Sequence, residues 1–324
     1  MPLRLVMMGT GDFAVPTYHA LYGSGHVVVG LFTQPDRTGS GHHHHVNPMK
    51  ELALAQGTPV FQPQNVNTPE SLAELRGLDV DLCVVAAYGQ ILSKDLLSIP
   101  RLGAINLHAS ILPRHRGAAP VQYAVWKGDR ITGVTIFQID PRLDAGMILA
   151  LETLEIDPHE TAGELEVRLA ELSAPLALRV IDELDQGTTQ PVPQDASLVT
   201  RAPRIKKEEG VIDWSKSNEE IGWHVRAMQP WPTAYTFLHQ SGRPATRLIL
   251  LEVKQVEPGP SHEDRPAEPG VVLSAENDRL VVQTGRGALE LVRVKPEGKR
   301  GMTAGEFLRG NLVRAGDRFT SSPS

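Results

Sequence analysis

The N-terminal third of the chain alternates between short apolar runs and segments whose apolar side chains recur at helical spacing. The apolar runs cover residues 3–9, 26–34, 59–63, 80–89 and 103–110. Near-continuous apolar runs of this length are typical of strands that are buried on both faces. The segments PMKELALAQG and PESLAELRG, which lie between such runs, have the spacing of amphipathic helices. The pattern therefore predicts an α/β fold with a mostly parallel sheet covered on both faces.

The pattern changes in the second half of the chain. Residues 161–187 have the spacing of a long amphipathic helix or helix pair, and a segment rich in proline and polar residues follows. Beyond it lie several short strand-like runs, with a hairpin predicted around Asn277 and Asp278. Such a series of short strands is typical of a small barrel. We therefore predict one domain at 1–188, a linker at 189–206 and a second domain at 207–324.

Composition narrows the class of protein. The chain has 324 residues, of which 41% are hydrophobic and 22% charged, as in a globular protein large enough for two domains. No apolar run approaches the roughly 18 residues of a membrane-spanning helix, and residues 3–9 resemble a strand more than a signal peptide. The net charge of −6 argues against a strongly basic nucleic-acid binder but leaves room for a local basic patch. The single cysteine, Cys83, lies in an apolar run, which favours a buried side chain in a reducing compartment over a reactive thiol.

Asn106 and His108 lie two residues apart at the end of the fifth apolar run. Alternate side chains of a strand point to the same side, so these two can converge on one atom. An asparagine amide and a protonated histidine are donors that stabilise the oxyanion formed when an amine attacks a carbonyl group. Asp140 and Asp144, in a loop after another apolar strand, offer a carboxylate to orient the imidazole or to accept the amine proton. Gly146 lets that loop bend closely.

The residues alone leave a structural alternative open. An Asn-x-His pair at a strand end is also typical of a hydrogen-bonded turn, and Gly9-Thr10-Gly11 is compatible with either a nucleotide-binding turn or a plain one. The sequence contains no Walker motif, no Gly-x-Ser-x-Gly elbow and no Cys/His pairing. Nothing in it therefore predicts a covalent enzyme intermediate.

The stretch NLHASILPRHRGAAPVQ resembles the signature of the formyltransferases that use 10-formyltetrahydrofolate. Matching segments follow one another along almost the whole chain: MGTGDFAVP, LFTQPDR, PVFQP, AAYGQIL, GVTIFQIDPRLDAGMIL, RIKKEEGVIDWSKS and MQPWPTAY. The resemblance implies a Rossmann-like formyl-transfer domain that binds a folate rather than a dinucleotide, followed by an OB-like barrel that binds tRNA. It also implies formyl transfer to the free α-amine of methionyl-initiator tRNA, a reaction of translation initiation.

The resemblance implies roles for individual residues as well. Asn106, His108 and Asp144 match the family's catalytic trio. Asn106 and protonated His108 are expected to stabilise the tetrahedral oxyanion, while Asp144 raises the pKa of the histidine and helps to move the amine proton. No metal is required. Folate contacts are expected from two loops and from the aspartate loop: Tyr88, Gln90, Ile91, Leu92, Ser110, Ile111, Leu112, Pro113 and Asp140.

The tRNA substrate is expected to leave a basic footprint. We expect contacts from the loop after QPDR, from the linker and from the C-terminal segment: Arg37, His42, His43, His44, His45, Lys50, Arg204, Lys206, Lys207 and Arg300. An ordinary solvated surface is the alternative for these basic clusters. Trp214 and Trp231 can stack on nucleotides, although we favour packing roles for both.

One segment departs from the family pattern. The loop after QPDR is usually rich in arginine and lysine, and here it reads RTGSGHHHHVNPMK. Four adjacent histidines cannot all face one metal ion, so we favour a loop that touches RNA over a metal site. The charge of such a loop varies between about pH 6 and pH 8. We therefore expect the affinity for tRNA to fall more steeply with rising pH than it does with arginine and lysine in the loop.

Three alternatives to this function remain. Enzymes that formylate an amino group on a nucleotide-linked sugar share the trio and the IDW and WP elements, but the long insertion between QPDR and PVFQP favours the tRNA substrate. A folate- or RNA-binding protein without transfer activity is the second alternative, and the intact trio argues against it. The third is a hydrolase that releases formate. We expect a monomer in the cytoplasm.

Overall fold

The structure is a computed structural model that describes residues 2–36, 47–256 and 267–323. Contacts between residues group the chain into two compact units. The first unit comprises residues 1–120, 131–155 and 164–204, and the second comprises residues 121–130, 156–163 and 205–324. This grouping describes packing, and the domain boundaries at 188 and 207 stay a prediction.

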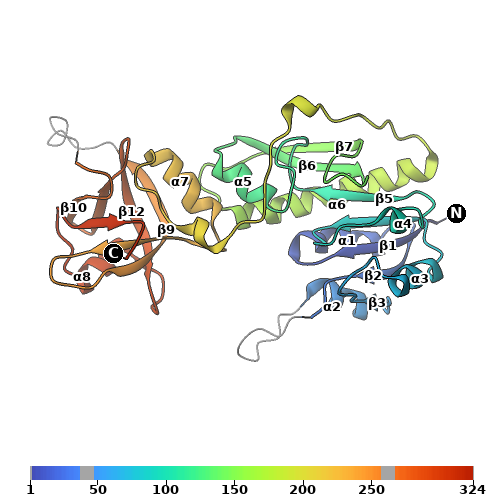
Figure 1. The fold of residues 1–324 in the computed structure, drawn as a ribbon, viewed down its shortest axis with the longest axis horizontal. Helices are drawn as coiled ribbons and strands as arrows, with labels where there is room; N and C mark the ends of the chain where they lie inside the picture. Colours follow the sequence, from blue (N-terminus) through green and yellow to red (C-terminus); the bar gives the residue numbers. More distant parts are fainter. Residues whose placement is uncertain (1, 37–46, 257–266, 324) are drawn as a thin grey trace. The chain divides into compact units, whose positions relative to one another are not determined.

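The first unit is built on a seven-stranded sheet in the order β3-β2-β1-β4-β5-β6-β7 (Figure 1). The first five strands in this order pair in parallel, whereas β6 and β7 are antiparallel to their neighbours. The predicted, mostly parallel sheet is therefore confirmed. The strands are β1 (Arg4–Gly9), β2 (Val27–Phe32), β3 (Val60–Phe61), β4 (Leu82–Ala86), β5 (Ala104–His108), β6 (Ile131–Gln138) and β7 (Ile148–Glu155).

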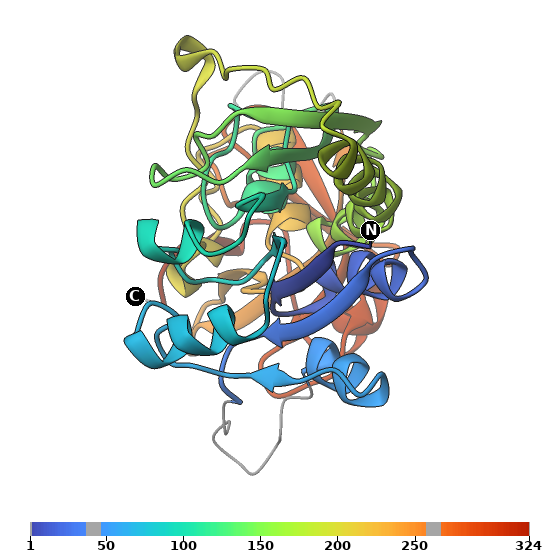
Figure 2. The same ribbon diagram turned by 90° about the vertical axis from the view of Figure 1, so that its right-hand side faces the viewer.

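Helices cover both faces of this sheet, with α3 and α4 on one side and α1 and α6 on the other (Figure 2). Most of them begin where a polar side chain accepts a hydrogen bond from a free backbone N–H, as Asn47, Thr68 and Ser93 do for α2, α3 and α4. The segment 161–187, predicted as a helix or a helix pair, contains a single helix, α6 (Ala162–Gln186). The helices of this unit are η1 (Asp12–Ala14), α1 (Val15–Tyr22), α2 (Pro48–Ala55), α3 (Pro69–Gly77), α4 (Lys94–Leu97), α6 (Ala162–Gln186) and η2 (Ala196–Leu198).

The second unit is a small antiparallel barrel. Its strands follow the order β10-β11-β12-β9-β8-β14, and an antiparallel bridge between Val271 and Arg318 joins the two ends of this path. The predicted hairpin is confirmed, because Asn277 and Asp278, with φ of 52° and 63°, connect β10 to β11. The strands are β8 (Ala234–His239), β9 (Thr246–Val256), β10 (Val272–Glu276), β11 (Arg279–Gln283), β12 (Ala288–Pro296), β13 (Met302–Thr303) and β14 (Arg318–Thr320). The helices are α5 (Pro120–Trp126), η3 (Lys207–Gly210), α7 (Asn218–Ala227) and α8 (Ala304–Gly310).

Candidate active site

Strand β5 fixes the positions of Asn106 and His108. Asn106 pairs with Val85 of β4 on one side and with Phe137 of β6 on the other. The strand is thus hydrogen-bonded along both edges, and the two side chains lie on the same side of it because they are two residues apart. His108 is buried and Asn106 is partly exposed. The structure therefore presents an amide and an imidazole together, as the alternation of the strand predicts.

A backbone contact sets the tautomer of His108. Its Nε2 atom lies 3.0 Å from the carbonyl oxygen of His115. A carbonyl oxygen can only accept, so Nε2 carries the proton, and in the neutral ring Nδ1 is left as an acceptor. The ring of Phe137 meets the imidazole edge-on, with 6.4 Å between ring centroids.

Burial lowers the pKa of His108, and this corrects one expectation from the sequence. Asp144 does raise that pKa, as expected, but the cost of desolvating a charged imidazole is larger. The neutral ring is therefore favoured at neutral pH, and the protonated His108 expected as an oxyanion donor is not the resting form. A neutral, oriented imidazole is suited to accept a proton from an attacking amine.

Asp144 lies in the loop that joins β6 to β7, and close backbone contacts hold it there. Its Oδ2 atom accepts a hydrogen bond of 2.8 Å from the backbone N–H of Gly117. A Cβ atom on Gly146 would lie 1.7 Å from the carbonyl oxygen of Gln138, and one on Gly117 would lie 2.4 Å from that of Ala202. Only glycine therefore lets these segments approach as closely as they do, which agrees with the role expected of Gly146.

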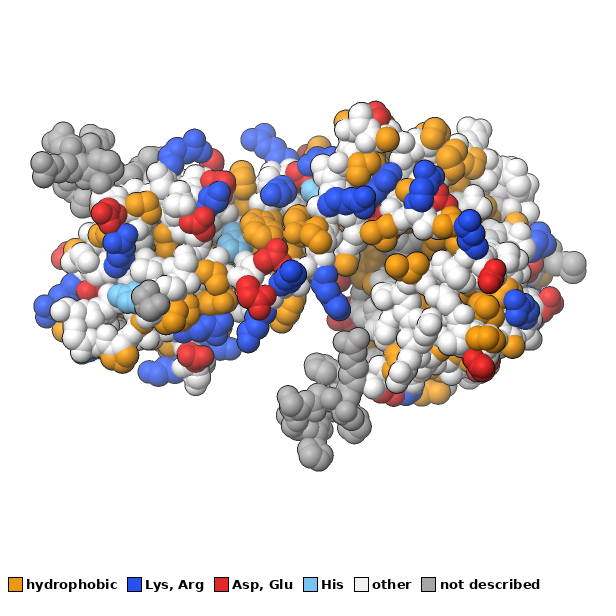
Figure 3. Space-filling view, viewed as in Figure 1, with side chains coloured by type: hydrophobic (Ala, Val, Ile, Leu, Met, Phe, Trp, Pro, Cys, Tyr) orange, Lys and Arg blue, Asp and Glu red, His pale blue; other side chains and the backbone are white. Residues whose placement is uncertain are grey.

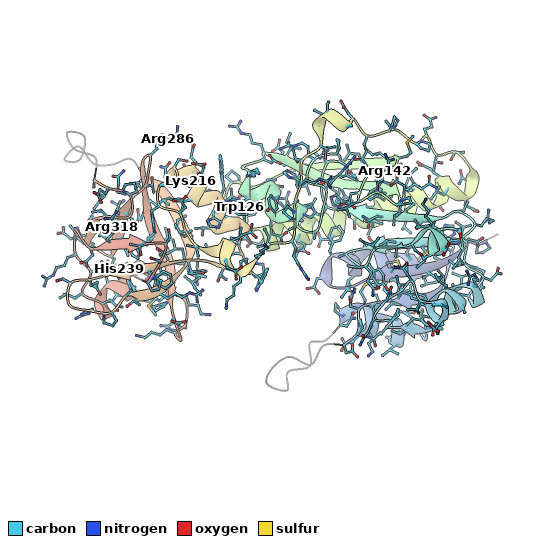
Figure 4. The ribbon with its side chains drawn as sticks, in the orientation of Figure 1. Trp126, Arg142, Lys216, His239, Arg286 and Arg318 are labelled. Carbon is cyan, nitrogen blue, oxygen red and sulfur yellow. The ribbon has the colours of Figure 1, made fainter. Side chains whose placement is uncertain are left out.

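The second aspartate of this loop has a different environment. Both carboxylate oxygens of Asp140 are hydrogen-bonded to Arg142, one to its backbone N–H and the other to its guanidinium group. Burial raises the pKa of Asp140, but these hydrogen bonds and the arginine charge outweigh it, and the pKa is lowered. Arg142, labelled in Figure 4, belongs to the same loop as the candidate catalytic carboxylate. Asp140 thus stays ionised and helps to shape the loop.

The residues expected to bind folate divide into exposed and buried groups. Ile91 is 77% exposed, and Leu143 of the aspartate loop, at 56%, offers a second apolar surface. By contrast, the side chains of Tyr88 and Leu92 belong to the hydrophobic core that packs α3 and α4 on the sheet. Ser110, Leu112 and Pro113 are buried, and Ile111 is partly exposed.

Hydrogen bonds within the protein already occupy several of the expected folate-binding side chains. The Oγ atom of Ser110 donates to the carbonyl oxygen of Arg114 at 2.7 Å. The amide of Gln90 accepts from the N–H of Val66 and donates to the carbonyl oxygen of Pro63. These side chains shape the loops, so a folate is expected to meet mainly backbone groups and the exposed apolar side chains.

The residues expected to contact tRNA are only partly within the described segments. Arg37 and His42–His45, and with them the hypothesis of a pH-dependent loop, lie outside the described residues. The ammonium group of Lys50 contacts the Asp36 carboxylate, and Arg300 pairs with Glu306 at 3.2 Å. Arg204, Lys206 and Lys207 are exposed. In Figure 3, lysine and arginine side chains are mixed with acidic ones over the visible face of the second unit.

The two tryptophans expected to pack differ in exposure. Trp214 is buried, and its indole N–H donates to the Thr236 hydroxyl at 2.9 Å, which confirms a packing role. Trp231 is 57% exposed, so the packing role expected for it is wrong. Cys83 is fully buried, as expected, and burial raises the pKa of its thiol to about 12.

A Rossmann-like unit that presents Asn, His and Asp side chains, followed by a small barrel, defines a two-domain formyl transferase. The family model described as formyl transferase matches residues 3–181, and the one described as formyl transferase, C-terminal domain, matches residues 204–312. A methionyl-tRNA formyltransferase of Methylococcus capsulatus is 42% identical over 98% of this chain and 99% of its own length. One of Agathobacter rectalis is 40% identical over 98% of this chain and 100% of its own. The chain therefore belongs to the methionyl-tRNA formyltransferase family.

Solved structures share the fold at much lower identity. An N-formyltransferase from Helicobacter canadensis, in complex with folinic acid and dTDP-3-aminofucose, superimposes with a TM-score of 0.65 at 15% identity. The match covers 89% of this chain and 98% of that one. HypX from Aquifex aeolicus, in complex with tetrahydrofolic acid, gives a TM-score of 0.60 at 16% identity, over 95% of this chain and 47% of that one.

The described segments contain neither a helix suited to span a membrane nor a group of side chains suited to hold a metal ion. None of their helices is both long and apolar enough to cross a membrane. Within residues 2–36, 47–256 and 267–323, no three His, Cys, Asp or Glu side chains are grouped so that they could hold a metal ion.

Proposed function

We propose that the chain transfers the formyl group of 10-formyltetrahydrofolate to the free α-amine of methionyl-initiator tRNA. The observation that carries the proposal is the grouping of Asn106, His108 and Asp144 in a chain that is 40–42% identical to methionyl-tRNA formyltransferases over nearly its whole length. A substrate of this kind has an amine with a pKa of about 7.7–8.0, so a usable fraction is neutral at pH 7.

The proposed chemistry follows from the neutral state of His108. The amine attacks the formyl carbon, and the side-chain N–H of Asn106 donates to the oxyanion that forms. Nδ1 of His108 accepts the proton that the attacking nitrogen loses, and the Asp144 charge stabilises the imidazolium. When the bond between the formyl carbon and N10 of the folate breaks, the same proton passes to N10. The amine has then exchanged one hydrogen for the formyl group, and the folate nitrogen has gained one.

The folate substrate is supported by the family and by two exposed apolar side chains. Ile91 and Leu143 are both more than half exposed, and each lies in a loop for which the resemblance implies folate contacts. Large exposed apolar side chains of this kind suit the faces of a flat heterocycle.

Sequence identity to known enzymes favours the tRNA substrate over an amino-sugar nucleotide. The sugar-modifying structure is 15% identical to the chain, whereas the tRNA-modifying relatives are 40–42% identical. We also propose a cytoplasmic location, where translation initiation takes place. We further propose a monomer, and light scattering on the purified chain tests this.

Labelled formyl transfer tests the proposal directly. The chain is given 10-formyltetrahydrofolate with methionyl-initiator tRNA, with a 4-amino-sugar nucleotide, or with no acceptor. We expect label on the tRNA, a loss of roughly 10²–10³-fold in Asn106→Ala, and full activity in the control Asn65→Ala, which changes an exposed asparagine of the same unit. Label on the sugar alone would overturn the substrate, and formate release without an acceptor would indicate a hydrolase.

A further inference from the structure

The segment 192–202 lies in the predicted linker. It contacts the loop that follows β5, the strand of Asn106 and His108, and the segment that carries Asp144 and leads into β7. At one end, Val192 and Ile148 exchange two backbone hydrogen bonds of 2.8 Å, just after the Asp144 loop. At the other end, Thr200 accepts hydrogen bonds from the backbone N–H groups of His115 and Arg116, at 2.8 and 2.9 Å. The segment is thus tied to the loop after β5 and to the loop after β6.

Gln194 lies between these two anchor points and uses its whole amide group. Its Nε2 atom donates to the carbonyl oxygen of Asp144 at 3.0 Å and to that of Gly146 at 2.8 Å. Its Oε1 atom accepts from the Nε and Nη2 atoms of Arg116, at 3.1 and 2.6 Å. One partly exposed side chain therefore connects the two loops.

The conformation of Asp144 explains why such a connection matters. Asp144 has φ of 48°, in the left-handed region that residues other than glycine rarely adopt. Such a residue keeps this conformation only where its surroundings fix it. Gln194 holds its carbonyl oxygen and the N–H of Gly117 holds its carboxylate.

The same contacts reach His108 through the backbone. Arg116, which binds the Gln194 amide, directly follows His115, whose carbonyl oxygen accepts from Nε2 of His108. The imidazole and the carboxylate are therefore attached to two loops that Gln194 joins.

We propose that Gln194 is a positioning residue for formyl transfer, because its amide holds the Asp144 loop at a fixed place relative to His108. The inference rests on the proposed function. The side chain does not need to touch either substrate. Its loss is expected to act on the rate of the chemical step rather than on binding.

Two substitutions separate positioning from a purely structural role. Gln194→Glu keeps an acceptor for Arg116 but cannot donate to the two carbonyl oxygens, which its carboxylate repels. Gln194→Ala removes both functions. We expect kcat to fall by roughly 10- to 100-fold in each, as is typical of residues that orient catalytic groups, with little change in the KM of either substrate. The matched control is Gln190→Ala, an exposed glutamine shortly before the same segment.

The titration of His108, followed by NMR and assigned with His108→Gln, provides a readout that is independent of activity. The charged or titratable groups acting on the ring are Asp144, His115 and Arg116. If Gln194→Ala releases the Asp144 loop, the pKa of His108 falls further, because less negative charge lies beside the ring. Gln190→Ala should titrate like the unchanged chain.

The outcomes are distinct. A lower kcat in both Gln194 variants, together with a lower pKa of His108 in Gln194→Ala, supports the proposal. A wild-type kcat in Gln194→Glu, or an unchanged titration of His108 in Gln194→Ala, overturns it. Failure of the unchanged chain to formylate methionyl-tRNA would instead refute the proposed function, and the NMR titration would still decide whether Gln194 positions Asp144.

Discussion

Each compact unit contains a buried histidine, and the two are held in similar ways. Nε2 of His108 lies 3.0 Å from the carbonyl oxygen of His115, and Nε2 of His224 lies 2.6 Å from that of Glu209. Burial lowers the pKa of both rings. Burial, tautomer and the direction of the pKa shift therefore do not distinguish a candidate catalytic histidine from a structural one.

The neighbours of the two rings do distinguish them. His224 stacks on Trp126, labelled in Figure 4, with 5.1 Å between centroids and 12° between planes. His108 instead shares a strand face with Asn106 and lies in the field of Asp144, whose loop is fixed by glycines and by Gln194. A donor and a carboxylate beside the ring, rather than the ring itself, indicate acid–base chemistry.

The strongest test of this comparison replaces each histidine with glutamine. His108→Gln should lower kcat by about 10²–10⁴-fold, because proton transfer from the attacking amine loses its acceptor. His224→Gln should leave kcat nearly unchanged below its unfolding temperature, since its amide can still donate to Glu209. Labelled formyl transfer to methionyl-tRNA measures both. Equal losses in the two variants would contradict the assignment of roles.

Removing the charge beside His108 should have the next largest effect. Asp144→Asn retains an oxygen that accepts from the Gly117 N–H but loses the negative charge. We expect kcat to fall roughly 10²-fold and the pKa of His108 to fall further. Steady-state kinetics and NMR titration measure these changes. Asp185→Asn, which changes an exposed aspartate of α6, is the control and should affect kcat much less.

Acid should destabilise both units through their histidines. Since the folded pKa values of His108 and His224 are lowered from about 6.5, the unfolded chain binds more protons below that pH. The free energy of unfolding should therefore decrease as pH falls through about 6.5, by at most about 1.4 kcal/mol per pH unit for each histidine. Urea unfolding of His224→Gln should show a shallower pH dependence than the unchanged chain. Parallel curves would argue against a lowered pKa at His224.

The smallest effects are expected at exposed cations. Lys206 and Lys207 are exposed where the chain enters the second unit, whereas Arg300 is paired with Glu306. Replacing both lysines with alanine should weaken tRNA binding at low salt. It should also reduce the slope of log affinity against log salt by roughly 0.7–0.9 for each phosphate that a lysine no longer neutralises. Arg300→Ala should change the slope less. Filter binding at several salt concentrations measures the affinity and its slope. An unchanged slope in the double variant would mean that tRNA does not bind at Lys206 and Lys207.

The sequence was sufficient for the elements that depend on local patterns. The strands β1 to β5 follow from apolar runs, and the placing of Asn106 and His108 on one face follows from the two-residue repeat of a strand. The hairpin of β10 and β11 was predictable as well, because Asn277 and Asp278 are residues that favour a tight turn between two strands. Each of these features is decided by residues that are neighbours in the chain.

Features that depend on distant contacts were not predictable. The resting charge of His108 depends on how completely the fold buries it, and the contact of Gln194 with Asp144 spans fifty residues of chain. Family motifs also do not say which side chains face a ligand, so Tyr88 and Leu92 were expected at the folate although their side chains lie in the core. Whether Trp231 packs or lies at the surface depends on how the rest of the unit folds around it. The sequence alone therefore could not show that its side chain is exposed.

The hydrogen bond from His108 to His115 has a kinetic consequence. Nε2 is committed to a carbonyl oxygen, so in the proposed reaction the other ring nitrogen, Nδ1, both receives the proton and returns it. The attacking amine and the departing folate nitrogen must then lie on the same side of the ring at the same time. In the proposed direct transfer the formyl group passes from folate to amine without bonding to the enzyme. Initial-rate plots should therefore intersect, as they do when a ternary complex is obligatory, rather than run parallel.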